Sequence, residues 1–200
     1  PKPSFKVEGV FLNDGKQEIA AKLKKDFEKE SDAETFLQQA QTTEFKVLNV
    51  ETRPGTRTAS APFTTSTLQQ EASRKLGFPV SLTMMVAQKL YESGKITYMR
   101  TDSVNLSSLA INTTKNEIES EYGKQYSKVR HFSTKSKGAQ EAHEAIRPTY
   151  INEHSISGTA QEKKLYELIW KRTIASQMAD AELEKTTVTV SISKGVTVQN

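Results

Sequence analysis

Tyr98 and Arg100 stand two residues apart in the segment 95–103, which reads KITYMRTDS. In an extended segment, side chains at positions i and i+2 share a face, so we expect both to point the same way. A free phenol has a pKa of about 10, and only about one in a thousand is ionised at neutral pH. A neighbouring guanidinium stabilises the phenolate and can hold a phosphate oxygen through two hydrogen bonds. The pair is a candidate nucleophile beside a phosphate clamp, although most tyrosines simply pack with a wet hydroxyl.

A second cluster of charged residues, QEAHEAIRPT, covers residues 140–149. It has neither of the zinc-binding helix patterns HExxH and HxxEH, and the other two histidines stand far off in sequence. In a helical turn His143 and Arg147 lie one turn apart on the same face, which suits a phosphodiester. The alternative is a charged surface turn that Pro148 ends.

A third stretch, RTASAPFTTSTLQQ, places six hydroxyl side chains and one arginine at residues 57–70, where a helix is expected to start. Free backbone N–H groups at a helix start favour an anion, but hydroxyl residues also occur there simply as caps. Gln88 and Glu92 follow at positions i and i+4 of the next expected helix. They either reach the site of Tyr98 or form a solvated helix face.

The expected fold class is α+β, with strands at the two ends of the chain and helices in the middle. Strands are expected near 5–11, from Phe45 until Pro54-Gly55, and near 187–198, while 17–27 suits either a return strand or a helix. Helices are expected to begin at five capping residues, which are Ser31, Ser66, Ser81, Ser107 and Thr159. Glycines end three of these helices, and a mobile polar loop is expected over 127–138. The simplest architecture is a helical domain, 57–182, inserted between the segments 1–56 and 183–200 of a β-rich domain.

Composition excludes several classes of protein. The chain has 200 residues, a net charge of +4 and no cysteine, which rules out disulfides, thiolate zinc sites and a cysteine nucleophile. No apolar run approaches the roughly 18 residues of a membrane span, and no signal peptide is present, so we expect a cytoplasmic protein. The phosphate-binding patterns GxxxxGK[ST] and GxGxxG are absent, which argues against a nucleotide cofactor. The first residue is not Met, which suggests a piece of a longer chain. Six basic and three acidic residues in 57–110 permit a polyanionic partner.

Taken together, four stretches resemble bacterial DNA topoisomerase I, a type IA topoisomerase. They are PFTTSTLQQ at 62–70, AQKLYE at 87–92, ITYMRTDS at 96–103 and QEAHEAIRPT at 140–149, in the family order. The combination is highly specific, where each piece alone is not. Met99 after the tyrosine resembles topoisomerase I more than topoisomerase III, which usually has proline there.

The resemblance implies ATP-independent relaxation of negatively supercoiled DNA by single-strand cleavage, strand passage and religation. Tyr98 would attack a backbone phosphate of single-stranded DNA, leaving a 5′-phosphotyrosyl link and a free 3′-hydroxyl. Arg100 would hold the scissile phosphate, and His143 matches the family histidine near the site. Thr101 and Asp102 match its hydrogen-bonding neighbours. Gln88, Glu92 and Arg147 complete the expected DNA-contacting set. The resemblance also implies that the helical insert is the family's movable gate domain and that the β-rich segments belong to its arch.

The family's Toprim domain, with its magnesium-binding carboxylates and catalytic Glu and Lys, is not in this sequence. We therefore expect magnesium in the whole enzyme with ligands elsewhere, no metal site in this chain, and no relaxation by these residues alone. The expected partner is single-stranded DNA at the cleavage site, bound by a monomer. Two other readings stay open: a non-catalytic single-stranded-DNA-binding module, and a tyrosine recombinase, which forms the opposite 3′-phosphotyrosyl link.

Overall fold

The computed structural model of the chain describes residues 2–12, 15–133 and 144–192. It mixes helices and strands, which confirms the α+β class. The elements are, in chain order, β1 (Glu8–Leu12), β2 (Glu18–Lys22), α1 (Glu30–Ala40), β3 (Phe45–Arg57), α2 (Thr65–Leu76), α3 (Val80–Glu92), α4 (Ser108–Glu121), the 3-10 helix η1 (Lys124–Tyr126), α5 (Ala160–Ser176) and β4 (Ala181–Ile192). The chain divides into two compact units, a helical unit over Gly55–Leu183 and a strand-rich unit formed by Pro1–Pro54 and Glu184–Asn200.

Strands β1 and β2 form an antiparallel hairpin in the strand-rich unit, with Glu8 opposite Lys22 and Leu12 opposite Glu18. The segment 17–27 therefore supplies a return strand, and the helical alternative for it is wrong. Asn13 and Asp14, between the two strands, lie outside the described residues.

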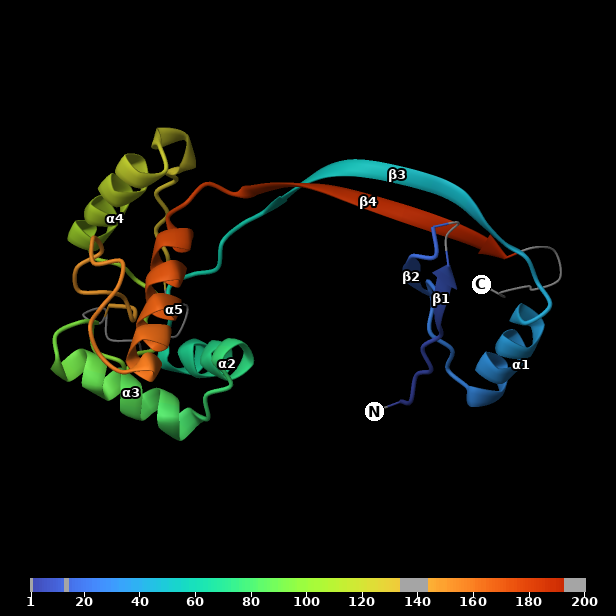
Figure 1. Cartoon of the computed structure of the whole chain (residues 1–200), viewed down its shortest axis with the longest axis horizontal. Coiled ribbons are helices and arrows are strands. Elements are labelled where there is room, and N and C mark those ends of the chain that lie inside the picture. The colour runs from blue at the N-terminus through green and yellow to red at the C-terminus, as the bar shows by residue number, and fades with distance from the viewer. Residues whose placement is uncertain (1, 13–14, 134–143, 193–200) are drawn as a thin grey trace. The chain divides into compact units, whose positions relative to one another are not determined.

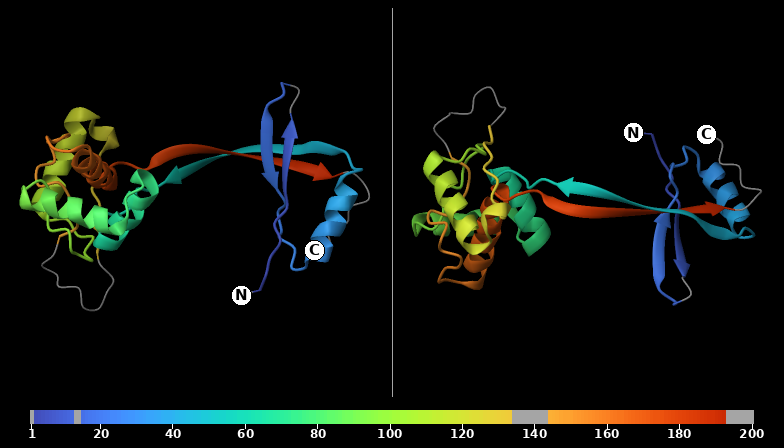
Figure 2. Two further views of the ribbon diagram at one scale, coloured as in Figure 1. Left: turned by 60° about the horizontal axis from the view of Figure 1, so that its bottom comes forward. Right: turned by 90° about the horizontal axis from the view of Figure 1, so that it is seen from above.

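Strands β3 and β4 form a separate two-stranded sheet, and Figure 2 shows them side by side in both views. The prediction that Pro54 and Gly55 end the strand is wrong, because β3 continues through both to Arg57. A two-stranded sheet leaves one edge of each strand unpaired, and proline, which has no N–H to donate, is tolerated at such an edge. Across the sheet the hydroxyl oxygens of Thr52 and Thr186 lie 2.9 Å apart.

Helix α5 lies in the middle of the helical unit, in contact with α2, α3 and α4 (Figure 1). Its apolar side chains face the core: Leu165 and Ile169 are fully buried, and Trp170 is nearly so. The Trp170 indole donates a hydrogen bond to the Ile151 carbonyl at 2.7 Å, which satisfies its one polar atom in the core. No helix of the described residues is both long and apolar enough to cross a membrane.

Two of the expected helix starts are confirmed by side-chain caps. The Ser107 hydroxyl accepts from the Ala110 N–H at the start of α4, and Thr159 forms a reciprocal capping box with Glu162 at the start of α5. In α2 the box is shifted by two residues, because Thr64 rather than Ser66 is the cap and pairs with Thr67. A run of four hydroxyl residues offers the same box in more than one register, so the pattern alone could not select it.

The other two expected caps are wrong. Helix α1 begins at Glu30 after Lys29, and α3 begins at Val80 after Pro79, neither with a side-chain cap. Ser31 and Ser81 therefore lie inside the first turns of their helices. The expected glycine stops are confirmed at Gly77, whose φ is 67°, and just after α3 at Gly94, whose φ is 70°, a left-handed conformation that suits glycine.

The segment expected as a mobile loop is partly fixed. Arg130 donates from Nη1 to the Ser176 carbonyl at 3.0 Å and also to the Met178 carbonyl, and its Nη2 contacts Asp180 at 2.6 Å. The side-chain amide of Gln177 in turn bonds both the N–H and the carbonyl of Arg130. These contacts hold Arg130 against the end of α5, while 134–138 lie outside the described residues.

Candidate active site

The stretches that resemble the family come together in the helical unit. Isolated antiparallel bridges join Phe63 to Ile146 and Ile96 to Pro148, so the segment 144–149 pairs with two of the other motif stretches, 62–70 and 96–103. The residues 144–149 form bridges and no helix. Arg147 therefore does not lie in a helical turn, as its expected pairing with His143 would require. His143 itself lies outside the described residues.

Tyr98 is 42% exposed, in a segment that has one β-bridge at Ile96 and is otherwise irregular. Exposed and buried side chains nevertheless alternate over Tyr98, Met99 and Arg100, although Ile96, two residues before Tyr98, is buried. The expectation that Tyr98 and Arg100 lie on one side is consistent with this alternation. The ring of Tyr91, from the end of α3, contacts the Tyr98 ring edge-on with centroids 5.2 Å apart.

The hydroxyl of Thr97 fastens the residue before Tyr98 to the segment 144–149. It donates to the Ala145 carbonyl at 2.7 Å and accepts from the Arg147 N–H at 3.0 Å. The Thr97 N–H also donates to the Arg147 carbonyl at 2.9 Å. The backbone just before Tyr98 is therefore held by three hydrogen bonds.

The hydroxyl of Thr65, the first residue of α2, fastens the other side of Tyr98. It donates to the Met99 carbonyl at 2.8 Å and accepts from the Thr101 N–H at 2.9 Å. The Thr65 N–H donates to the Thr101 carbonyl at 2.8 Å. Two threonines from different parts of the chain thus clamp the backbone on both sides of Tyr98 and Arg100.

The sequence alone does not indicate these anchors, because hydroxyls at the start of α2 predict either an anion site or helix caps. Thr64 and Thr67 form the capping box of α2, as the capping interpretation predicts. Thr65, between them, instead bonds the backbone of the segment that carries Tyr98. The only signal in the sequence is the run of hydroxyl residues, and this run does not indicate which hydroxyl bonds another segment of the chain.

Arg147, an expected DNA contact, is turned largely into the protein, with 16% of its side chain exposed. It donates to Glu144 at 2.6 Å and to the Pro148 carbonyl at 2.9 Å. Glu144 also accepts from the Ser107 N–H at 2.6 Å. Burial raises the pKa of Glu144, but the hydrogen bonds from Arg147 and Ser107 outweigh it and hold the pKa below its usual value. Glu144 therefore ties the motif segment to the start of α4 and Arg147 holds Glu144, while the contact of Arg147 with DNA stays a prediction.

The remaining expected DNA contacts have different surroundings. Gln88 donates to Glu92 at 2.6 Å, so these two side chains pair on one face of α3. Asp102 is exposed, whereas the Thr101 hydroxyl accepts from the Ser103 N–H at 3.0 Å. Arg100 is exposed and has no hydrogen-bond or ion-pair partner among the described residues. Of this set, Arg100 has the guanidinium most available to a phosphate.

Tyr98 is exposed, whereas Tyr166 of the same unit is buried. Tyr166 is 1% exposed and its hydroxyl donates to the Glu153 carbonyl at 2.6 Å. Burial and the nearby Glu153 charge raise the pKa of Tyr166 to about 12, which makes it a poor nucleophile.

Arg172 of α5 holds the segment that leads into Thr65, a role that no pattern in the sequence indicates. Its Nε donates to the Ala61 carbonyl at 2.6 Å, and its guanidinium lies 4.6 Å from the centre of the Phe63 ring. Its Nη1 contacts Glu71 of α2 at 3.2 Å. Hydrogen bonding by Lys75, together with the charges of Arg172, Lys75 and Arg74, holds the pKa of Glu71 below its usual value despite burial.

Comparisons of the sequence and the fold with known proteins all lead to one family. The family model described as DNA topoisomerase matches residues 1–199. DNA topoisomerase 1 of Synechocystis sp. is 54% identical over 151 residues, which cover 73% of this chain and 17% of that protein. DNA topoisomerase 1 of Zymomonas mobilis is 51% identical over 169 residues, which cover 83% of this chain and 14% of that protein.

A solved structure gives the same result. Full-length topoisomerase I from Thermotoga maritima matches with a TM-score of 0.66 and 36% identity, covering 94% of this chain and 32% of that one. The chain thus spans about a sixth of the length of the curated relatives and a third of the solved one. With the family model, the relatives and the solved structure in agreement, this chain belongs to the DNA topoisomerase family, among the bacterial type IA enzymes.

Proposed function

We propose that this chain carries the DNA-cleaving tyrosine of a type IA topoisomerase, which relaxes negatively supercoiled DNA without ATP. The observation that supports this most is the meeting of the motif segments around Tyr98. An exposed phenol is presented on a backbone that Thr65 and Thr97 fasten on both sides. Fixing the nucleophile in this way lowers the entropy lost when the phosphate arrives.

In the proposed reaction the Tyr98 Oη attacks the scissile phosphorus of a single strand and loses its proton. The bond from phosphorus to the 3′-oxygen breaks, and that oxygen leaves as a hydroxyl after taking up a proton. Arg100 holds the phosphate and balances the charge that builds up on its oxygens. Religation reverses these steps and needs no nucleotide, because the phosphotyrosyl ester conserves the free energy of the broken bond.

The magnesium that the resemblance implies does not fit the described residues. They contain no group of three or more histidine, aspartate or glutamate side chains that could hold a metal ion. Near the site, Glu144 is already bonded to Arg147 and Ser107, and Glu92 to Gln88. We propose that the metal ligands and the groups that move the protons lie in other parts of the protein. We also propose that the helical unit is the gate domain, that the strand-rich segments belong to the arch, and that the whole protein acts as a cytoplasmic monomer.

The test is to trap the covalent intermediate with the whole protein. An oligonucleotide labelled at either end is incubated with the protein and magnesium, the mixture is denatured, and the modified residue is mapped by mass spectrometry. We expect the adduct on Tyr98, through the 5′-phosphate. An adduct through the 3′-phosphate would indicate recombinase-type chemistry, and binding without any adduct would indicate a non-catalytic module, so either result contradicts the proposal.

The Thr65 anchor leads to a separate prediction. Thr65→Val removes a hydroxyl that makes two bonds to the backbone at Met99 and Thr101, at a cost of about 1–2 kcal/mol in stability. Because Tyr98 and Arg100 sit within that anchored stretch, we expect cleavage of a short oligonucleotide to slow about tenfold or more, while its binding changes little.

Thr65→Ser is the matched control, because it keeps the hydroxyl and removes only the methyl group. We expect it to restore the cleavage rate to within about threefold of the unmodified protein. Equal cleavage by the valine and unmodified proteins, measured in single turnover, would show that the anchor does not position Tyr98.

A further inference from the structure

We infer that the helical unit has a second nucleic-acid contact, a cleft that binds the backbone of a single strand away from Tyr98. The cleft has a volume of about 1490 Å³ and lies among α2, α5, the residues after β3 and the residues before β4. Neither Tyr98 nor Arg100 lines it. The inference rests on the proposed function, since it assigns a further contact to the same substrate.

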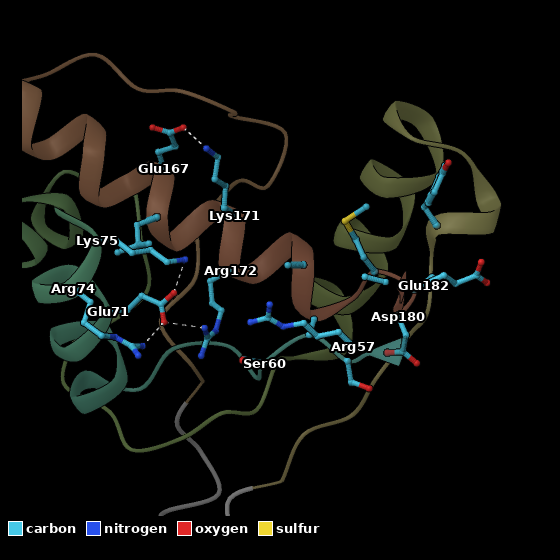
Figure 3. Close-up of a pocket in the computed structure, with 18 of the residues that line it drawn as sticks. Arg57, Ser60, Glu71, Arg74, Lys75, Glu167, Lys171, Arg172, Asp180 and Glu182 are labelled. Carbon is cyan, nitrogen blue, oxygen red and sulfur yellow. Dashed lines mark hydrogen bonds and ion pairs between the residues drawn. The ribbon is translucent and has the colours of Figure 1, made fainter. Parts of the chain in front are cut away.

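The charged groups of the cleft are mainly cationic. Six basic side chains line it, against four carboxylates, and they are Arg57, Arg74, Lys75, Lys164, Lys171 and Arg172. Figure 3 labels five of them, which are Arg74 and Lys75 on α2, Lys171 and Arg172 on α5, and Arg57 at the end of β3, and Lys164 lines the cleft from the first half of α5. An excess of positive charge in a concave surface attracts a polyanion.

Two of these cations are free to bind a ligand. Among the residues that the structure describes, the side chains of Arg57 and Lys164 have no hydrogen-bond or ion-pair partner, and both residues are exposed. The carboxylates, by contrast, are largely neutralised. Glu71 contacts three cations, and Asp180 lies 2.7 Å from the Lys128 ammonium. Among the charged groups that line the cleft, Arg57 and Lys164 are therefore the unpaired cations and Glu182 is the unpaired carboxylate, while the three cations around Glu71 outnumber that carboxylate.

The apolar part of the cleft favours a single strand over a duplex. Tyr126 is 49% exposed and lines the cleft together with the half-buried Leu76 and Met178. An exposed ring beside cations is the usual arrangement for single strands, whose bases are free to stack while the phosphates meet the charges. A duplex keeps its bases stacked inside and would gain nothing from Tyr126.

The test uses the whole protein carrying Arg57→Ala and Lys164→Ala together. The matched control is Lys115→Ala with Lys163→Ala. Lys163 is the exposed neighbour of Lys164 on α5, and neither control lysine lines the cleft. Binding is measured between about 0.05 and 0.3 M salt for a single strand of about 40 nucleotides and for a duplex of equal length. Cleavage is measured on a strand of about 8 nucleotides, which is long enough for the Tyr98 site alone.

We expect the cleft variant to bind the long single strand about tenfold more weakly at 0.1 M salt, with the salt slope reduced by about 1.4. Cleavage of the short strand and binding of the duplex should match those of the control. Unchanged binding of the long strand, or an equal loss for the duplex, would overturn the inference. Failure of the unmodified protein to cleave would instead contradict the proposed function, so the two can be told apart.

Discussion

Tyr98→Phe in the whole protein is expected to abolish covalent capture and relaxation of plasmid DNA while leaving single-stranded DNA binding within about twofold. The change removes one hydroxyl, which is the proposed nucleophile, and losses of about a thousandfold or more are usual when a nucleophile is removed. The hydroxyl has no hydrogen-bond partner among the described residues and the side chain is 42% exposed. The variant should therefore fold and melt as the unmodified protein does.

Tyr91→Phe is the matched control. Tyr91 is 40% exposed and contacts the ring of Tyr98, and phenylalanine keeps that ring contact. We expect this variant to relax plasmid at close to the unmodified rate. Relaxation by Tyr98→Phe at equal protein concentration would show that another group is the nucleophile. Equal loss in both variants would assign the effect to the aromatic pair rather than to one hydroxyl.

The elements of the fold that could be predicted are those whose signals are local. Thr159 and Glu162 specify the start of α5 by a capping box, and Gly77 specifies the end of α2 by its left-handed conformation. The end of β3 could not be predicted correctly, because proline interrupts a strand only where a neighbouring strand needs an N–H at that position, which proline lacks. That depends on the pairing with β4, which starts more than a hundred residues later.

In the candidate site, too, the residues selected by local sequence could be predicted, whereas the contacts between distant segments could not. Tyr98 and Arg100 could be selected from spacing and chemistry, and the family resemblance made the choice specific. The roles of Thr65 and Thr97 could not be derived, because each hydroxyl bonds backbone groups more than thirty residues away. A cation near a motif histidine predicts that Arg147 contacts DNA, but in the fold its guanidinium bonds Glu144 and two carbonyl groups.

A second large effect, on the stability of the chain, is expected when Arg172 is replaced, because Arg172 also contacts residues far away in the sequence. Arg172→Met keeps a long side chain of similar shape but removes the charge and all donors. The Ala61 carbonyl then loses its partner and Glu71 loses one of its three cations. Removing one member of a buried ion pair costs about 3–5 kcal/mol. Because Lys75 and Arg74 remain beside Glu71, we expect a loss of about 2–3 kcal/mol.

The measurement is thermal unfolding of the 200-residue chain, where such a loss should lower the Tm by about 5–10 °C. Lys171→Met is the matched control, since Lys171 adjoins Arg172 on α5 but pairs with Glu167 at an exposed position, with side chains 66% and 56% exposed. Exposed pairs of this kind contribute at most about 0.5 kcal/mol, so the control should melt within about 2 °C of the unmodified chain. If the two variants melt alike, the contacts of Arg172 with Ala61, Phe63 and Glu71 do not hold α5 to the segment that carries the Thr65 anchor.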